Sequence, residues 1–235
     1  MMCLKVKEKM SESMTAAVLL TLAGGFQDAY SYNSRGMVFA NAQTGNVVLL
    51  AQNLSQGNIR MALRYLVPLA AFFCGICVTE WLQNLGKESN GIHWRQKVLI
   101  LEMGTLILVG FLPQSMNAFA NALMSFSCAM QVNSFRKFNG IACATTMCIG
   151  NFRTATEMLC KYHFTKDQEA KRKCIHCYFI ILIFGIGAAF GGLFSTLVKE
   201  QAIWTAASIL FLSILMMLGQ EESESVKSTS RQACL

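Results

Sequence analysis

Six strongly apolar runs, separated by more polar segments, follow one another along the chain. They cover Met14–Tyr32, Met61–Leu85, Val98–Leu112, Asn117–Phe135, Ile175–Val198 and Gln201–Leu218. A bilayer core requires about 20 helical residues, and the shortest run reaches this length by extending into its flanks. The pattern predicts an all-α integral membrane protein with about six transmembrane helices.

Two further stretches are membrane-like in length but unusually polar. Residues 38–54 read VFANAQTGNVVLLAQNL, and residues 143–162 read CATTMCIGNFRTATEMLCKY. A charged residue that faces lipid at a helix centre costs about 2.5–3.5 kcal/mol, so a stretch that contains Arg153 and Glu157 is no ordinary lipid-exposed span. We expect both stretches to be broken or re-entrant segments that face protein or water.

The two polar stretches occupy matching places in an internal repeat. A long apolar run and then a shorter one follow each of them. The matched positions pair Gln27 with Gln131, Gly36 with Gly140, Gly45 with Gly150 and Asn46 with Asn151. This shared order favours a duplication, with one repeat unit over residues 14–115 and a second over 116–219. Residues 1–13 are expected to form a cytoplasmic N-terminal tail, and residues 220–235 a disordered C-terminal tail.

The distribution of Lys and Arg favours six spans with inverted halves over eight spans with parallel halves. With the N-terminus inside, six spans place fifteen Lys and Arg residues in cytoplasmic segments and four outside. Eight spans place twelve inside and seven outside. Basic loops remain preferentially in the cytoplasm, so the first arrangement fits better.

Composition and charge narrow the class of protein further. Hydrophobic residues make up 54% of the 235 residues, charged residues only 14%, and the mean hydropathy is +0.41, whereas soluble domains carry about a quarter charged residues. The net charge of +7 comes from basic residues between the apolar runs, without a nucleic-acid motif, so we expect no nucleic-acid partner. The chain has no HExxH or GxSxG motif and no pair of membrane acids suited to proteolysis, so we expect no enzyme.

The ten cysteines lie mostly in apolar or semi-apolar stretches, where they serve as small packing residues. Cys174, His176 and Cys177, near His163, could suggest zinc. A structural zinc site needs four ligands, and no second cysteine pair lies in a loop to complete this group. We therefore expect no metal and no cofactor.

Interrupted polar segments at matching positions of two repeats are typical of the midplane site of a secondary transporter. Because glycine tolerates unusual φ and ψ, and Thr or Asn can cap a following helix, we expect the chain to break at Thr44-Gly45-Asn46. The candidate solute-binding residues are Gln27, Asp28, Asn41, Thr44, Gly45, Asn46, Gln131, Asn133, Thr146, Gly150 and Asn151. The alternative is that these residues hold helices together by close packing and hydrogen bonds.

Charged residues in the apolar pattern have two interpretations as well. Asp28 either couples transport to a proton or cation, or is a buried hydrogen-bond partner at the helix end, for example of Arg35. Arg153 and Glu157 are four residues apart and can pair on a helix. We interpret them as a structural pair, with a gate as the alternative.

Four blocks carry a resemblance to the YoaK family, a bacterial membrane family long filed as a domain of unknown function. They are Gly25-Phe26-Gln27-Asp28-Ala29, Val38-Phe39-Ala40-Asn41, Thr44-Gly45-Asn46-Val47-Val48-Leu49-Leu50 and Ala129-Met130-Gln131-Val132-Asn133. The resemblance covers nearly the whole chain and implies a polytopic inner-membrane protein, but no activity. The family's second block usually reads Thr-Gly where this chain has Ile149-Gly150, although Arg136-Lys137 keeps its basic pair. If both blocks bind one solute, the second half contributes less here.

These features predict a multi-pass protein of the bacterial inner, or cytoplasmic, membrane that transports an unidentified small solute or ion through a site between two repeat units. The alternative is a non-transporting membrane scaffold or sensor whose polar motifs serve helix packing. The expected partners are the lipid bilayer and the solute or ion, and a homo-oligomer is left open.

Overall fold

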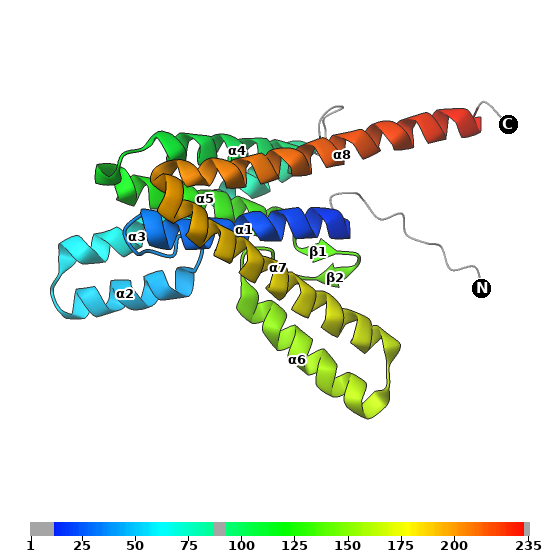
Figure 1. The fold of residues 1–235 in the computed structure, drawn as a ribbon, viewed down its shortest axis with the longest axis horizontal. Coiled ribbons are helices and arrows are strands. Elements are labelled where there is room, and N and C mark those ends of the chain that lie inside the picture. The colour runs from blue at the N-terminus through cyan, green and yellow to red at the C-terminus, as the bar shows by residue number, and fades with distance from the viewer. Residues whose placement is uncertain (1–11, 87–92, 233–235) are drawn as a thin grey trace.

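Eight α-helices dominate the computed structural model, which describes residues 12–86 and 93–232, with side chains as far as Leu218 (Figure 1). The helices are α1 (Met14–Ser34), α2 (Gln43–Ser55), α3 (Ile59–Gly86), α4 (Trp94–Phe111), α5 (Asn117–Ser134), α6 (Cys148–Thr165), α7 (Gln168–Val198) and α8 (Ile203–Gln232). Two short 3₁₀ helices, η2 (Gln114–Met116) and η3 (Lys199–Ala202), precede α5 and α8. Strands β1 (Lys137–Phe138) and β2 (Ile141–Ala142) form a small antiparallel hairpin. The all-α prediction is confirmed.

Some helices are longer than the apolar runs that predicted them. His93 caps α4 by accepting a hydrogen bond from the Arg95 N–H at 3.2 Å, so α4 begins four residues before the predicted Val98. Glu102 therefore lies at the middle of α4 and not near its end. α8 continues to Gln232 and so includes most of the tail from residue 220 that was expected to be disordered. The expected N-terminal tail lies outside the described residues, except for its last two.

The helices of the two halves pack against each other in a crossed arrangement. α1 lies along α7, α5 lies along α3, and α4 lies along α8. α2 packs on the first part of α3, and α6 packs on the first part of α7, so that each pair projects from the body as an arm (Figure 1). The body is thus formed by helices from both halves of the chain.

Glycines allow α1 and α7 to approach closely. A Cβ atom added at Gly187 would lie 2.2 Å from the Leu22 carbonyl oxygen, and one added at Gly191 would lie 2.5 Å from that of Phe26. The spacing of four residues puts both glycines on one face of α7, where helix backbones can meet. In the same way, Gly75 allows α3 to approach α5 closely.

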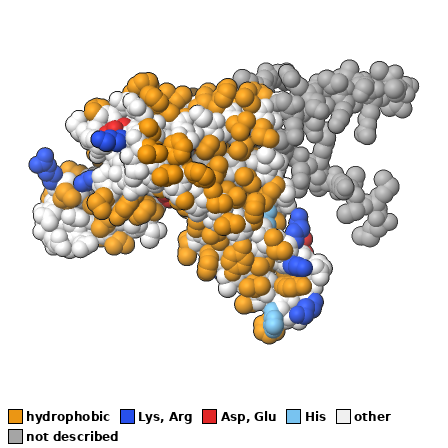
Figure 2. Space-filling view, viewed as in Figure 1, with side chains coloured by type: hydrophobic (Ala, Val, Ile, Leu, Met, Phe, Trp, Pro, Cys, Tyr) orange, Lys and Arg blue, Asp and Glu red, His pale blue; other side chains and the backbone are white. Residues whose placement is uncertain are grey.

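The interior of the body is apolar, and so is much of its surface. Leu20 and Phe26 of α1, Leu106 of α4 and Met124 of α5 are fully buried in one hydrophobic core. Figure 2 shows hydrophobic side chains over most of the face in view, with Lys and Arg at its margins. A soluble protein would not expose so much apolar surface, so this distribution supports a membrane protein.

By length and composition, two stretches of the described residues can cross a membrane. Ile59–Leu85 has a hydropathy of 1.9, and Gln168–Leu218, which comprises α7, η3 and the first part of α8, has a hydropathy of 2.2. The other predicted spans carry too many polar or charged residues, such as Glu102 and Gln131, to stand out by this measure.

Candidate functional site

Two extended segments, residues 35–42 between α1 and α2 and residues 143–147 between β2 and α6, bring polar residues into the body of the molecule. After α1 the chain turns at Gly36 (φ 83°) and Met37 (φ 59°) and runs back along the helix it has just left. The Ala40 N–H donates to Ser31 Oγ at 3.1 Å, and Ser125 Oγ of α5 donates to the Ala40 carbonyl at 2.5 Å. The first turn of α2 therefore begins inside the body, beside α1 and α5.

The second extended segment enters in the corresponding way from α5. The hairpin turns at Asn139 (φ 48°) and Gly140 (φ 74°), and Gln131 Nε2 then donates to Thr145 Oγ1 at 2.8 Å. Thr145 lies against the middle of α1, because a Cβ atom at Gly24 would be 2.8 Å from its carbonyl oxygen. α6 thus also begins next to α1.

The expected break at Thr44-Gly45-Asn46 is wrong, and the chain does not break at the matching Gly150 either. Both glycines lie in the first turn of a regular helix, α2 or α6, are exposed, and have open space where a Cβ would be. The positive φ angles occur at Gly36 and Gly140 instead, because the chain must reverse before it can enter the body. Exposed Thr44 also points away from the interior, so Thr44, Gly45 and Gly150 lie outside the buried group of polar residues.

Asn46 and Asn151 have a backbone-bracing role that the sequence did not reveal. Asn46 Nδ2 donates to the carbonyl of Phe39 at 3.4 Å, and Asn151 Nδ2 donates to the carbonyl of Ala144 at 2.6 Å. Each asparagine therefore reaches back seven residues to the extended segment that precedes its helix. This pair supports the packing interpretation for two of the candidate residues.

Most of the remaining candidates gather around two carboxylates, those of the fully buried Glu102 and the half-buried Asp28. Gln27 Nε2 of α1 donates to Glu102 Oε1 of α4 at 3.3 Å, and both residues are fully buried. The backbone N–H of Asn41, at the inner end of the first extended segment, faces the Asp28 carboxylate. Cys128 of α5 lies within electrostatic reach of Asp28 and Glu102. Thr146, from the second extended segment, lies against Gly24 of α1. Residues from three helices and two extended segments thus form a central polar cluster.

Many polar atoms of this cluster have no hydrogen-bond partner. They include Gln27 Oε1, Asp28 Oδ1, both amide atoms of Asn41, Glu102 Oε2, Gln131 Oε1 and Thr146 Oγ1. Buried polar groups in proteins are nearly always hydrogen-bonded, because an unpaired one costs about 1–3 kcal/mol. Several such atoms, gathered in one region of the interior, make this cluster the candidate functional site.

The sequence had suggested Arg35 as a partner of Asp28, but the two side chains do not pair. The Arg35 guanidinium is fully buried and donates to Tyr30 Oη at 2.8 Å, to the Val109 carbonyl at 2.6 Å and to the Leu112 carbonyl at 2.8 Å. It therefore caps the C-terminal end of α4, where a cation interacts favourably with the helix dipole. Asp28 is left without a basic partner among the described residues.

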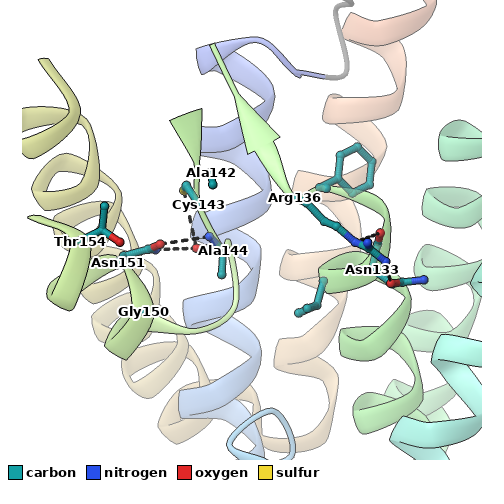
Figure 3. Close-up of a pocket in the computed structure, with 10 residues that line it drawn as sticks. Asn133, Arg136, Ala142, Cys143, Ala144, Gly150, Asn151 and Thr154 are labelled. Carbon is teal, nitrogen blue, oxygen red and sulfur yellow. Dashed lines mark hydrogen bonds between the residues drawn. The ribbon is translucent and has the colours of Figure 1, made fainter. Parts of the chain in front are cut away.

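Asn133 lies apart from the central cluster, at the opposite end of α5 from Asn117. It donates to Glu80 Oε1 at 2.8 Å and accepts from Arg136, which also pairs with Glu80 at 3.3 Å. Figure 3 shows Asn133 and Arg136 on one side of a pocket of about 350 Å³, with Gly150 and Asn151 on the other. This pocket opens beside the second extended segment and offers a route toward it.

The predicted pair of Arg153 and Glu157 is also not formed. Both side chains are exposed on α6, and among the described residues no ion pair joins them. Cys174, His176 and Cys177 are buried along α7, and within residues 12–86 and 93–232 no group of three His, Cys, Asp or Glu side chains could hold a metal ion.

Sequence reasoning missed Glu102, Thr145 and Cys128 as parts of the cluster. Glu102 carried a usable signal, because it is a carboxylate within an apolar run, but the run began too late in the prediction and placed Glu102 at a helix end. Thr145 and Cys128 are common residues in membrane helices and loops, so only their neighbours distinguish them.

Comparison with known proteins agrees with a membrane protein. The chain is 25% identical over 205 residues to the UPF0700 transmembrane protein YoaK of Bacillus subtilis (strain 168), which covers 84% of this chain and 90% of that protein. No solved structure matches. A family model described as a protein of unknown function, DUF1275, matches residues 16–216. The chain therefore belongs to the DUF1275 family, as the resemblance to YoaK predicted.

Proposed function

We propose that this protein transports a small solute or ion across a membrane through the central polar cluster. The observation that carries the proposal is the pair of carboxylates, Asp28 and Glu102, which have unpartnered oxygens and no basic partner among the described residues. Carboxylates within the membrane region of a protein are costly and usually serve an ion, proton or substrate pathway. Two re-entering segments whose helices begin beside them are typical of transporters.

In this proposal the chain crosses the cell membrane six times, through α1, α3, α4, α5, α7 and α8, and α2 and α6 belong to re-entrant segments. The two ends of the body support this topology. Glu12 pairs with Arg95 at 3.0 Å and Glu80 with Arg136 at one end, while Gln114 binds Glu200 at the other. The basic residues Arg95 and Arg136 then lie on the cytoplasmic side.

An inverted repeat accounts for the crossed packing of the helices. If α1–α4 correspond to α5–α8, the contact of α1 with α7 corresponds to that of α5 with α3, and α2 on α3 corresponds to α6 on α7. The matched turns at Gly36 and Gly140 support the same relation. The central cluster would lie between the two units, where their relative movement could expose it to each side in turn.

A membrane scaffold or sensor is the second candidate function. It is favoured by Asn46 and Asn151, whose side-chain amides are used to brace the backbone. In a scaffold the central cluster would stay closed to water, so the two functions differ in whether water-soluble reagents reach it.

Thiol accessibility separates the two functions. In a variant without native cysteines, Asn41→Cys and Thr146→Cys test the inner ends of the two extended segments, and Ala206→Cys, in the fully buried apolar core, is the matched negative control. In cells or proteoliposomes, a transporter should let a membrane-impermeant thiol reagent modify positions 41 and 146 but not 206. If all three positions resist modification from both sides of the membrane, the scaffold is the better function.

A further inference from the structure

The pair formed by Gln27 and Glu102 has too few hydrogen-bond donors for its acceptors. Their one hydrogen bond, from Gln27 Nε2 to Glu102 Oε1, leaves Gln27 Oε1 and Glu102 Oε2 buried and unpartnered. A carbonyl oxygen and a carboxylate oxygen are both acceptors, so neither can satisfy the other. A single proton on Glu102 Oε2 supplies the donor that this pair lacks.

The basic residues on and around α4 lie toward its two ends among the described residues. Arg95 and Lys97 are in its first turn, and Arg35 binds the carbonyls of Val109 and Leu112 at its other end. The short helix η3, which carries Lys199 and Glu200, also packs on α4, and the Glu200 carbonyl accepts from Tyr30, the partner of Arg35.

Around Glu102, α1 contributes Gln27 and Asp28, and α5 contributes the Cys128 thiol. The α8 residues 203–218, which pack on α4, include no charged side chain. On α3, Glu80 binds Arg136 at one end of the body and Arg64 binds the Gly36 carbonyl at the other, at 2.8 Å. An ionised carboxylate in such a place would be buried without a counter-ion, which is very costly.

We propose that Glu102 is a proton-binding site, in which the carboxyl group takes up one proton at neutral pH and pairs with the side-chain amide of Gln27. The step is COO⁻ plus H⁺ to COOH, and it needs no other reactant. Glu102 would then bring a proton to the middle of the body, beside Asp28. The inference deepens the proposed transport function, since it names the proton as the coupling ion of that same site.

Infrared spectroscopy of the full-length protein in lipid nanodiscs tests the protonation directly. At pH 7 the wild-type protein should show the carbonyl stretching band of a protonated carboxylic acid, which shifts in D₂O. Glu102→Gln should abolish this band. Gln27→Met should keep it at a changed frequency, because the hydrogen-bond partner is lost. Glu157→Gln, which removes an exposed carboxylate on α6, is the matched control and should leave the band unchanged.

The inference is overturned if the wild-type protein has no such band at pH 7, or if the band persists unchanged in Glu102→Gln. It is also overturned if replacing choline chloride by sodium chloride removes the band, because a metal cation would then occupy the site. Should Glu102→Gln fail to fold, an unaltered band frequency in Gln27→Met would also overturn it. None of these measurements depends on transport, so a sealed central cluster in the thiol experiment would overturn the transport function alone.

Discussion

The side-chain amide of Asn151 forms two hydrogen bonds with the backbone of Ala144, one as acceptor and one as donor. Its Oδ1 accepts from the Ala144 N–H at 3.0 Å, and its Nδ2 donates to the Ala144 carbonyl at 2.6 Å (Figure 3). In an extended segment the backbone N–H and carbonyl have no partner within a helix, so the asparagine side chain provides one for each. The start of α6 is thereby tied to the second extended segment.

Removing this brace should destabilise the protein strongly. Asn151→Ala loses two hydrogen bonds and leaves partly buried backbone groups of Ala144 unpaired, so we expect a loss of about 1–3 kcal/mol in the free energy of unfolding. Asn46→Ala, which removes a weaker contact, should cost about 1 kcal/mol. The denaturation midpoint in mixed detergent micelles measures both. The control is Asn53→Ala, whose bond to the Leu49 carbonyl is exposed. Equal midpoints for Asn151→Ala and Asn53→Ala would contradict the bracing role.

Two glycines of α7 should respond oppositely to the same substitution. Gly187→Ala places a methyl group 2.2 Å from the Leu22 carbonyl oxygen and should cost about 1–3 kcal/mol by separating α7 from α1. Gly185→Ala meets open space and should stabilise α7 by about 0.5–1 kcal/mol, since alanine is the better helix former. Thermal unfolding in detergent compares them. A similar loss of stability at both positions would mean that the effect does not come from the close packing of α1 against α7.

Gly36 and Gly45 make a second matched pair, which tests where the chain breaks. Gly36→Ala puts a side chain at φ 83° and against the Arg64 guanidinium, and should cost at least about 1–2 kcal/mol. Gly45→Ala lies in the first turn of α2 and should be neutral or slightly stabilising. Expression level and denaturation midpoint report both effects. A greater loss of stability at position 45 than at position 36 would support the break first expected from the sequence.

The topology can be tested at two loops. With six spans and fifteen basic residues inside, the loop around residues 86–93, mostly outside the described residues, and the turn around residues 165–169 both face the cytoplasm. Reporter fusions at these two places should be active only with a cytoplasmic reporter. Opposite compartments at the two places would indicate eight spans and parallel halves.

The turn between α6 and α7 should be sensitive to acid. The Lys161 ammonium, at 3.1 Å, and the N–H of Glu169, at 2.9 Å, hold the pKa of Asp167 below its ordinary value. A lowered pKa stabilises the fold above the ordinary pKa of the carboxyl, and this contribution disappears as the pH falls through the lowered value. Hydrogen exchange at the start of α7, corrected for its intrinsic pH dependence, should therefore increase in acid.

The control for the acid response is Asp167→Asn, which can still cap α7 but cannot titrate. This variant should show a smaller response over the same range, with the remainder due to Glu169, whose pKa is also lowered by its ion pair with Arg172. If the wild-type protein and Asp167→Asn respond equally to acid, the sensitivity comes from another group.

The sequence by itself determined the helical membrane fold and the special place of the two polar stretches. Apolar runs of about 20 residues have few other stable forms, and polar residues in a lipid-facing helix are too costly to be accidental. Matching positions such as Gln27 and Gln131 identified the regions that enter the body. These conclusions depend on local composition, which does not change when the chain folds.

Only the tertiary structure decided which of these residues meet. Gln27 and Glu102 are 75 residues apart and come together because α1 and α4 both pack on α5 and α8, which no local pattern encodes. Likewise, glycine is permitted both in a helix and at positive φ, so Gly36 and Gly45 could not be distinguished until the direction of the chain after α1 was known. Arg153 and Glu157 had the spacing of a pair, but both side chains are exposed on α6, where an ion pair contributes little stability.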